Sequence, residues 1–301
     1  MTAFLLAKLC KDAGLPDGVL NIIHGLGHTV GAAITEHPLI HAISFTGGTK
    51  TGETIARVAA PHFKKLSLEL GGKNPNIIFA DADIDEAALI SARAAFTNQG
   101  EICLCGSRIM IERSIYDTFR TKFLDHVRAF IVGDPLDDSS HQGALVSQAH
   151  LDKVLEYIEL AKQEGGSIAI GGKRMYLNGR CVGGYFIEPT VIEGLDCTCR
   201  TNQEEIFGPV VTLMPFDNEI EVIAMANSTQ YGLAAMIWTQ NVARAHRVAA
   251  QLESGIVWIN CWMVRDLRTP FGGVKNSGVG REGGFEAFKF FTEVKNVCLK
   301  I

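Results

Sequence analysis

The feature that most constrains the fold is an alternation of short apolar strands with helical segments over the first seventy residues. Apolar residues at three- and four-residue spacing predict a helix over residues 2–13. Strands are expected at residues 19–23, 40–45 and 65–70, with helices up to Pro38 and over residues 51–60 between them. Strands separated by helices in short order imply a parallel, doubly wound sheet of the α/β class.

The rest of the chain repeats this alternation with longer elements. We expect helices over residues 84–96, 114–130, 150–162, 219–227 and 242–252, and strands over residues 108–112, 167–170, 210–216, 234–238 and 256–260. Residues 171–184 are rich in turn formers and are expected to be an exposed loop. Because the first sheet ends at Gly71-Gly72, we place a domain boundary there. Only about half of a dinucleotide-binding fold precedes it.

The amino-acid composition limits the kinds of binding partner that we expect for this chain. The net charge is −5 and charged residues make up 20% of the chain. This balance creates no positive electrostatic field that would attract a polyanion, so we expect no nucleic-acid partner. No run approaches the ~18 apolar residues of a membrane span. Lys8 interrupts the apolar start too early for a signal peptide. The eight cysteines are therefore expected to be reduced thiols of a cytoplasmic protein.

We expect no metal site. The two close cysteine pairs have C-x-C spacing, whereas zinc sites generally use C-x₂-C or wider. His37 and His41 are four residues apart, but Pro38 between them argues against a shared helix.

A glycine-rich turn, FTGGTKTG at residues 45–52, joins a predicted strand to a predicted helix. This order of elements presents free backbone N–H groups that suit a phosphate. The alternative is a tight strand-to-helix turn without a ligand.

Cys103 and Glu69 are the candidate catalytic pair. Cys103 follows a turn at Gly100 and precedes a strand, which would let its backbone N–H face a bound carbonyl. Glu69 lies at the end of a strand, where a buried carboxylate can serve as a base for a thiol or a water. The alternative for Cys103 is a buried structural cysteine.

Five motifs occur in order: FTGGTKTG, LELGGKNP, NQGEICLCGSR, EEIFGPV and PFGGVKNSGVGREGG. Together they resemble the aldehyde dehydrogenase superfamily over essentially the whole chain. Cys103 follows Glu69 by 34 residues, as the nucleophile follows the base in that family. The resemblance implies a partial Rossmann-type cofactor domain at residues 1–71, a complete α/β catalytic domain at residues 72–283, and a C-terminal segment at residues 284–301.

The family's chemistry can be carried onto matching residues. Cys103 would attack an aldehyde and form a thiohemiacetal, hydride would pass to NAD, and Glu69 would activate the water that hydrolyses the resulting thioester. Cys105 falls where the family often has alanine, so we expect no catalytic role for it. The implied cofactor-binding residues are Gly48, Leu70, Gly71, Glu205 and Phe207.

Arg265 falls at the family's substrate-tunnel position, where an arginine suits a carboxylate. With GEICLCGSR and SGIVWINCW, it resembles the branch that oxidises 2-aminomuconic semialdehyde, a compound of tryptophan catabolism, or the 2-hydroxy analogue. The alternative is an ion pair of Arg265 with Asp266 or Glu282. Glu282 itself matches an acidic residue near the family's water channel, and its alternative role is structural.

The family's oxyanion-binding asparagine and ribose-binding lysine have no counterpart in these residues. We therefore expect the 301-residue chain to be an N-terminally truncated form with little dehydrogenase activity by itself. One alternative is a catalytically silent subunit that associates with full-length chains, and another is a cofactor-free thiol esterase. Residues 292–301 resemble the family's C-terminal oligomerisation strand, so a homo-oligomer, a dimer or tetramer, is expected.

Overall fold

The computed structural model describes residues 2–301, which divide into two compact units. Unit 1 comprises the residues up to Ser44 together with Glu53–Leu66, and unit 2 comprises Phe45–Gly52 and Ser67–Ile301. The two units differ greatly in how much of their apolar surface is buried.

Unit 1 consists mainly of short helices. Its elements are α1 (Thr2–Asp12), the π-turn η1 (Gly27–Gly31), α2 (Ala32–Glu36), the start of β1 (Ala42–Thr46), most of α3 (Thr49–Ala59), η2 (Ala60–His62) and the start of β2 (Lys65–Glu69). The buried Lys64 ties the end of α2 to the segment before β2. Its Nζ donates to the carbonyl oxygens of Thr35 and His37 at 2.6 and 2.7 Å.

The strand predicted at residues 19–23 is wrong. These residues form turns and irregular backbone, and the Val19 and Ile23 side chains are both 65% exposed. Pro16 and Gly18, with a φ of +88°, turn the chain just before this segment. Within residues 2–301 no strand pairs with it, and an apolar run without a neighbour gains no ladder hydrogen bonds.

Unit 2 is built on a seven-stranded sheet. Its order is β12 (Ile256–Ile259), β11 (Ala234–Trp238), β3 (Pro75–Ile78), β4 (Arg108–Glu112), β9 (Val210–Phe216), β8 (Thr190–Glu193) and β5 (Ser167–Ile170). Neighbouring strands are parallel except β5, which runs antiparallel to β8. The carboxyl half of β2 pairs with β14 (Gly278–Val279) in a separate sheet, with Glu69 opposite Gly278.

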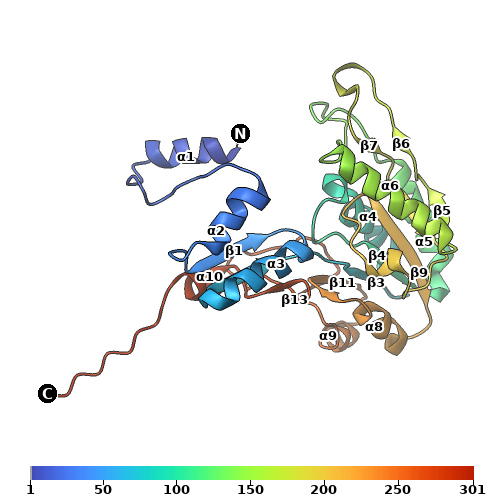
Figure 1. Cartoon of the computed structure of the whole chain (residues 1–301). Helices are drawn as coiled ribbons and strands as arrows, with labels where there is room; N and C mark the ends of the chain where they lie inside the picture. Colours follow the sequence, from blue (N-terminus) through green and yellow to red (C-terminus); the bar gives the residue numbers. More distant parts are fainter. Residues whose placement is uncertain (1) are drawn as a thin grey trace. The chain divides into compact units, whose positions relative to one another are not determined.

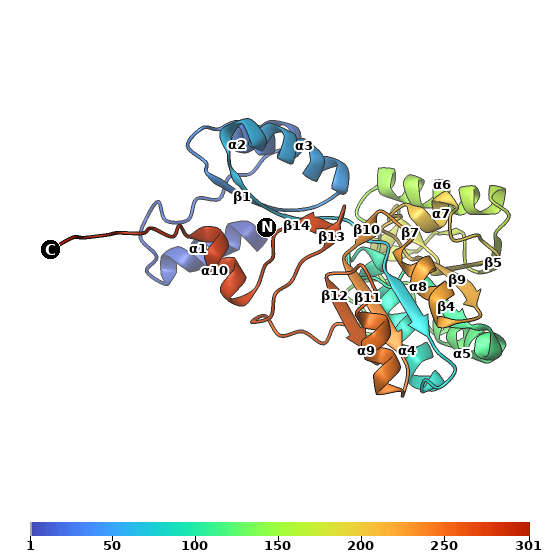
Figure 2. The same ribbon diagram turned by 90° about the horizontal axis from the view of Figure 1, so that it is seen from below.

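Helices cover both faces of the large sheet (Figures 1 and 2). α4 (Ile84–Phe96) and α5 (Tyr116–Arg128) pack on one face, and α8 (Glu219–Asn227) and α9 (Val242–Ala249) pack on the other. Side chains alternate accordingly: Ile78 and Ile109 join the first core, and Ile77 and Met110 join the second. This alternation is the period of two expected for strands buried on both faces.

A third core lies under α6 (Gln148–Gln163), which packs against Ile192 and Val210. The remaining elements are short: η3 (Thr97–Gly100), η4 (Arg113–Ile115), β6 (Arg174–Met175), η5 (Gly179–Cys181), β7 (Phe186–Ile187), α7 (Arg200–Gln203), β10 (Tyr231–Gly232), β13 (Val274–Lys275) and α10 (Gly284–Phe291).

The predicted α/β class is confirmed, and many predicted elements match within a few residues. Two central strands, β3 and β8, were missed. β3 begins at Pro75, and proline argues against an interior strand because it cannot donate to a ladder. β8 has four residues and follows Pro189 directly.

Residues 292–301 form no strand within the described chain, and their Val297 and Leu299 side chains are 80% and 81% exposed. The expected pairing with a second copy stays a prediction. No helix in residues 2–301 is both long and apolar enough to cross a membrane.

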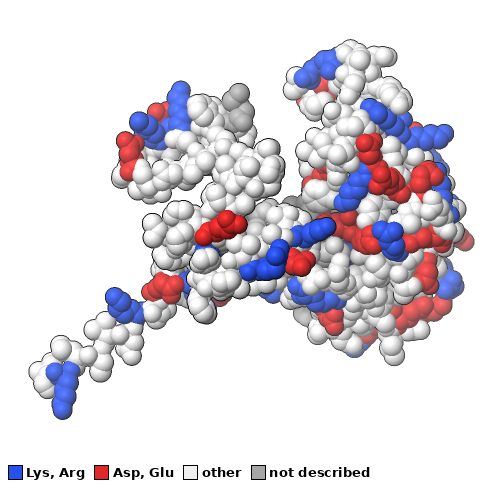
Figure 3. Space-filling view, in the orientation of Figure 1, with Lys and Arg blue, Asp and Glu red and all other residues white. Residues whose placement is uncertain are grey.

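Charges of both signs are interspersed over the face of unit 2 in Figure 3. Many are paired, as in Arg113–Asp217, Arg120–Glu193 and Arg247–Glu219.

Candidate active site

The loop that carries Cys103 enters the sheet at the amino end of β4. Asn98 and Gln99, just before it, have φ values of 52° and 57°, which are strained for residues other than glycine. The buried Asn74, at the amino end of β3, fixes the loop. Its Nδ2 donates to the carbonyl oxygens of Cys103 and Cys105 at 2.7 and 2.8 Å. Its Oδ1 accepts from the backbone N–H of Ala234 at 3.0 Å, which anchors the amide in turn.

The Cys103 thiol is half-buried. Burial, followed by the nearby charges of Glu205 and Glu69, raises its pKa to about 11. Arg265 and a hydrogen bond from the residue's own backbone N–H act in the opposite direction. The thiol is therefore protonated at neutral pH and requires a base to become a nucleophile. Cys105 is more deeply buried, and burial raises its pKa to about 12.

Glu69 supplies a carboxyl group of suitable pKa. It is 3% exposed, and neither carboxylate oxygen has a hydrogen-bond partner in the described part of the chain. Burial and then the negative charge of Glu282 raise its pKa to about 7, while Arg281 and Arg265 oppose the shift. A buried carboxyl that is half-ionised near neutral pH suits general base catalysis.

Glu205 lies against the glycines that follow β2. Its Oε1 accepts from the backbone N–H of Gly72 at 2.9 Å. A Cβ atom at Gly71 would lie 2.4 Å from Glu205 Oε2, so only glycine allows the carboxylate to sit here. Burial raises the pKa of Glu205, with Lys153 and Lys73 opposing. Two residues further on, Phe207 has a φ of 60° and a partly exposed side chain.

The other expected cofactor residues, Gly48 and Leu70, flank the start of α3. A Cβ atom at Gly48 would have no atom within 4 Å, so there is open space at the first turn of this helix. The Leu70 side chain packs against Gly52, and its backbone N–H donates to the carbonyl of Ser277 at 2.9 Å. This open helix start next to a glycine turn fits a phosphate group.

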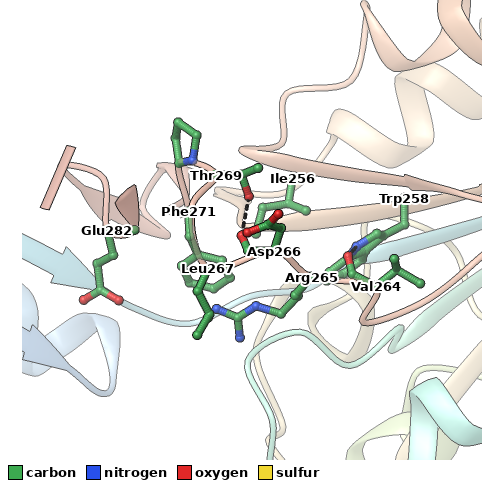
Figure 4. Close-up of a pocket in the computed structure, with 11 residues that line it drawn as sticks. Ile256, Trp258, Val264, Arg265, Asp266, Leu267, Thr269, Phe271 and Glu282 are labelled. Carbon is green, nitrogen blue, oxygen red and sulfur yellow. Dashed lines mark hydrogen bonds between the residues drawn. The ribbon is translucent and has the colours of Figure 1, made fainter. Parts of the chain in front are cut away.

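Arg265 lines a cavity of about 230 Å³, shown in Figure 4. Its guanidinium carbon lies 4.3 Å from the centre of the Phe271 ring, and Glu282 lines the same cavity. Asp266 is hydrogen-bonded to Arg268 instead. No ion pair joins Arg265 to Asp266 or Glu282 among residues 2–301, and the charge of Arg265 acts on both Cys103 and Glu69.

Glu69, Glu205 and Arg265 all lie within electrostatic range of the Cys103 thiol, since each of them acts on its pKa. The loops of Cys103 and Glu205 both precede strands, so this part of the site lies at the amino ends of β4 and β9. Within residues 2–301 no group of three or more histidine, cysteine or acidic side chains is placed to hold a metal ion.

Sequence reasoning missed Asn74 and two buried cations. Lys73 is 2% exposed, and burial and then Arg108 lower its pKa to about 7, against the pull of Glu205. Arg108 is fully buried and donates to the carbonyl oxygens of Lys73, Met225 and Ala226. The available signals were Lys73-Asn74 directly after Gly71-Gly72, and an arginine directly before the apolar centre of a strand.

A sequence model of the aldehyde dehydrogenase family matches residues 1–297, and the chain belongs to this family. The resemblance expected from the five motifs is thus confirmed. The chain is 51% identical over 302 residues to a 2-aminomuconic semialdehyde dehydrogenase of Danio rerio, with 100% of this chain and 62% of the relative covered. It is 47% identical to a 2-hydroxymuconic semialdehyde dehydrogenase of Pseudomonas sp. strain CF600, again with 100% and 62% covered.

Solved structures agree with this assignment. An indole-3-acetaldehyde dehydrogenase of P. syringae, in complex with NAD+, superposes with a TM-score of 0.97 at 42% identity, covering 100% of this chain and 61% of that one. A betaine aldehyde dehydrogenase of Staphylococcus aureus, also with NAD+, gives a TM-score of 0.93 at 40% identity, with 96% and 57% covered. The chain thus spans 62% of the length of the first of these relatives.

Proposed function

We propose that this site oxidises an aldehyde to a carboxylic acid with NAD as the hydride acceptor. The observation that carries the proposal is a half-buried thiol, Cys103, within electrostatic range of Glu69, a buried carboxyl with a pKa of about 7. The thiol, whose pKa is raised to about 11, needs such a base.

Every chemical step except acceptance of the hydride would fall to a residue of this chain. The Cys103 sulfur bonds to the carbonyl carbon, with Glu69 as the base, and a thiohemiacetal results. The Cys103 backbone N–H stabilises the developing oxyanion. Bound NAD would supply the acceptor for the hydride that leaves this carbon, and a thioester would remain on Cys103. Glu69 then releases the thiol proton to solvent and, as a carboxylate again, takes a proton from water, whose oxygen attacks the thioester. The carbon–sulfur bond breaks, and the acid and the free thiol are released.

The cofactor would be held by residues on both sides of the site. The first turn of α3 at Gly48 would take the phosphates. Glu205 would accept hydrogen bonds from a ribose diol. Its carboxylate is held in one orientation, since one oxygen accepts from the Gly72 N–H and the other lies against Gly71. Phe207 and the backbone of Leu70 and Gly71 would line the nicotinamide side.

The substrate we propose carries a carboxylate, as 2-aminomuconic and 2-hydroxymuconic semialdehydes do. Arg265 stacks on Phe271 and has no carboxylate partner among residues 2–301, so its guanidinium is available for a bidentate contact. Its charge also lowers the pKa of the Cys103 thiol, which supports a carboxylate-binding group within electrostatic range of the nucleophile.

The first experiment measures NADH formation from NAD and 2-aminomuconic semialdehyde. It uses the 301-residue chain alone, and the same chain supplied with the part of the Danio rerio relative that the match leaves uncovered. NADH formation by either preparation, lost in Cys103→Ser, supports the proposal. No NADH from either preparation, or undiminished turnover in Cys103→Ser, contradicts it. Ester hydrolysis without NAD as the only activity would favour the thiol esterase.

A second experiment tests the substrate class. We expect Arg265→Ala to raise KM for the carboxylate-bearing semialdehyde about 10–100-fold and to leave KM for acetaldehyde nearly unchanged. Arg268→Ala is the matched control, because Arg268 is on the same loop, is paired with Asp266 and is 88% exposed. Equal effects of Arg265→Ala on the two aldehydes would remove Arg265 from the substrate site.

A further inference from the structure

His150 lies in the first turn of α6, where Ser147 caps its backbone N–H at 3.2 Å. Its Nε2 has two neighbours from different parts of the chain. One is the carbonyl oxygen of Phe207 at 2.6 Å, and the other is Oε1 of Glu101 at 3.4 Å. Both neighbours are acceptors, so Nε2 carries a proton, which it donates to the Phe207 carbonyl oxygen with the Glu101 carboxylate beside it.

Both partners of His150 belong to strained backbone segments. Phe207 has a φ of 60°, and Asn98 and Gln99, which precede Glu101, have φ values of 52° and 57°. Such conformations cost about 1–3 kcal/mol each and persist only where the surroundings enforce them. The imidazole is one of the groups that enforce them, because its donor fixes the direction of the Phe207 carbonyl.

The two segments also pack backbone against backbone. A Cβ atom at Gly100 would lie 2.2 Å from the carbonyl oxygen of Gly208 and 2.9 Å from the nitrogen of Pro209. Such close contact transmits any shift of one segment to the other. One segment leads to Cys103, and the other carries Glu205 and Phe207.

Further contacts from α6 and the loop before it reinforce the pair. Lys153, one turn after His150, donates through Nζ to the carbonyl oxygen of Glu205 at 3.1 Å. The backbone N–H of Val146 donates to Glu101 Oε1 at 3.2 Å, and that of Gly143 donates to Gln99 Oε1 at 3.3 Å.

We propose that His150 is a positioning residue that straps the Cys103 segment to the Glu205–Phe207 segment, so that the nucleophile and the nicotinamide side keep a fixed relation. The strap itself follows from the contacts of residues 98–103, 143–153 and 205–208. Its significance for catalysis rests on the proposed function. His150 contacts neither reacting atom and acts only through these two segments.

The strap is tested by peptide-level amide hydrogen exchange on the 301-residue chain, which requires no turnover. In His150→Ala we expect peptides covering residues 98–107 and 204–210 to exchange about tenfold faster than in the unchanged chain, both together. His150→Gln, whose Nε2 reaches a similar position, is expected to stay within about twofold. The exposed His246 on α9 provides the control variant His246→Ala, which should leave both peptides unchanged.

Faster exchange in only one of the two peptides, or in neither, would overturn the proposal. If His150→Ala raises exchange throughout unit 2, exchange of the two peptides is instead compared between His150→Gln and His150→Asn. The asparagine amide is too short to reach Phe207, so only the asparagine variant should loosen both peptides, and equal protection in the two variants would overturn the strap.

In a preparation that forms NADH, His150→Ala should lower kcat with KM for the aldehyde unchanged. Loosened peptides without any NADH from the unchanged protein would mean that the strap exists and the proposed function is wrong.

Discussion

Helices α1 and α4 are similar in length and apolar content, but their surroundings differ completely. α1 in unit 1 buries none of its residues, and its Phe4 and Leu9 side chains are 62% and 64% exposed. α4 in unit 2 buries seven residues, including Phe96 at 0% exposure. Periodicity predicted both helices correctly. The difference teaches that a pattern sets which face can be buried, whereas stability depends on what packs against that face.

The largest expected effect is in amide exchange of the two helices. Because α1 has no buried face, its amides should exchange at least about 10³-fold faster than those of α4. Exchange mass spectrometry on peptides from residues 2–12 and 84–96 measures this ratio. Comparable protection in the two helices would break the comparison.

Next in size is the effect of removing a phenylalanine. Phe123 is fully buried and stacks on Phe119 and Phe96, with ring centroids 5.8 and 6.4 Å apart. Phe123→Ala should lower the free energy of unfolding of unit 2 by about 3–5 kcal/mol. Phe4→Ala, at an exposed position, should change stability by at most about 0.5 kcal/mol. Urea denaturation followed by tryptophan fluorescence reports on unit 2, which holds all three tryptophans.

The same contrast explains how much could be predicted from the sequence. Strands of unit 2 such as residues 210–216 were placed to the residue, because buried neighbours on both faces reinforce the local pattern. The run at residues 19–23 is also largely apolar, but no strand among residues 2–301 pairs with it, and it forms no strand. β3, which no prediction covered, begins at Pro75, and the sheet accepts a proline at the first position of a strand.

For the site, the sequence identified the groups with chemical reactivity and missed the groups that hold them. Cys103 and Glu69 stood out through their motifs. Asn74 and His150 did not, because their partners are backbone carbonyl oxygens that lie up to 57 residues away in the chain. A single sequence carries no direct record of such long-range hydrogen bonds.

The third prediction concerns the carboxyl of Glu69. Its pKa is raised from 4.5 to about 7, so the folded protein binds this proton more tightly than the unfolded chain does. Stability is therefore lost as pH rises from about 4.5 through about 7. The stability of Glu69→Gln relative to the unchanged protein should increase by about 2–3 kcal/mol between pH 5 and pH 8. Urea titrations at the two pH values measure it, with Glu36→Gln at an exposed position of unit 1 as the background. A pH-independent difference would contradict the raised pKa.

The smallest effect concerns the start of α4. Asp83 accepts a hydrogen bond from the backbone N–H of Glu86 at 3.1 Å, whereas Gly31 before α2 provides no side-chain cap. Asp83→Ala should lower the free energy of unfolding of unit 2 by about 1 kcal/mol. Thermal denaturation resolves a change of this size. An unchanged midpoint would mean that packing alone fixes the start of α4.

The hydrogen bonds of Asn74 determine how late in protein synthesis the Cys103 loop can become fixed. Its amide holds the Cys103 loop only while Ala234, 160 positions later in the chain, donates to its oxygen. Arg108, at the start of β4, likewise donates to the carbonyl oxygens of Met225 and Ala226, which are synthesised much later. During synthesis the cysteine therefore emerges long before the residues that fix its loop. A nascent chain that does not yet include Ala234 carries this thiol in an unfixed loop, which chaperones and cellular oxidants meet before any substrate does.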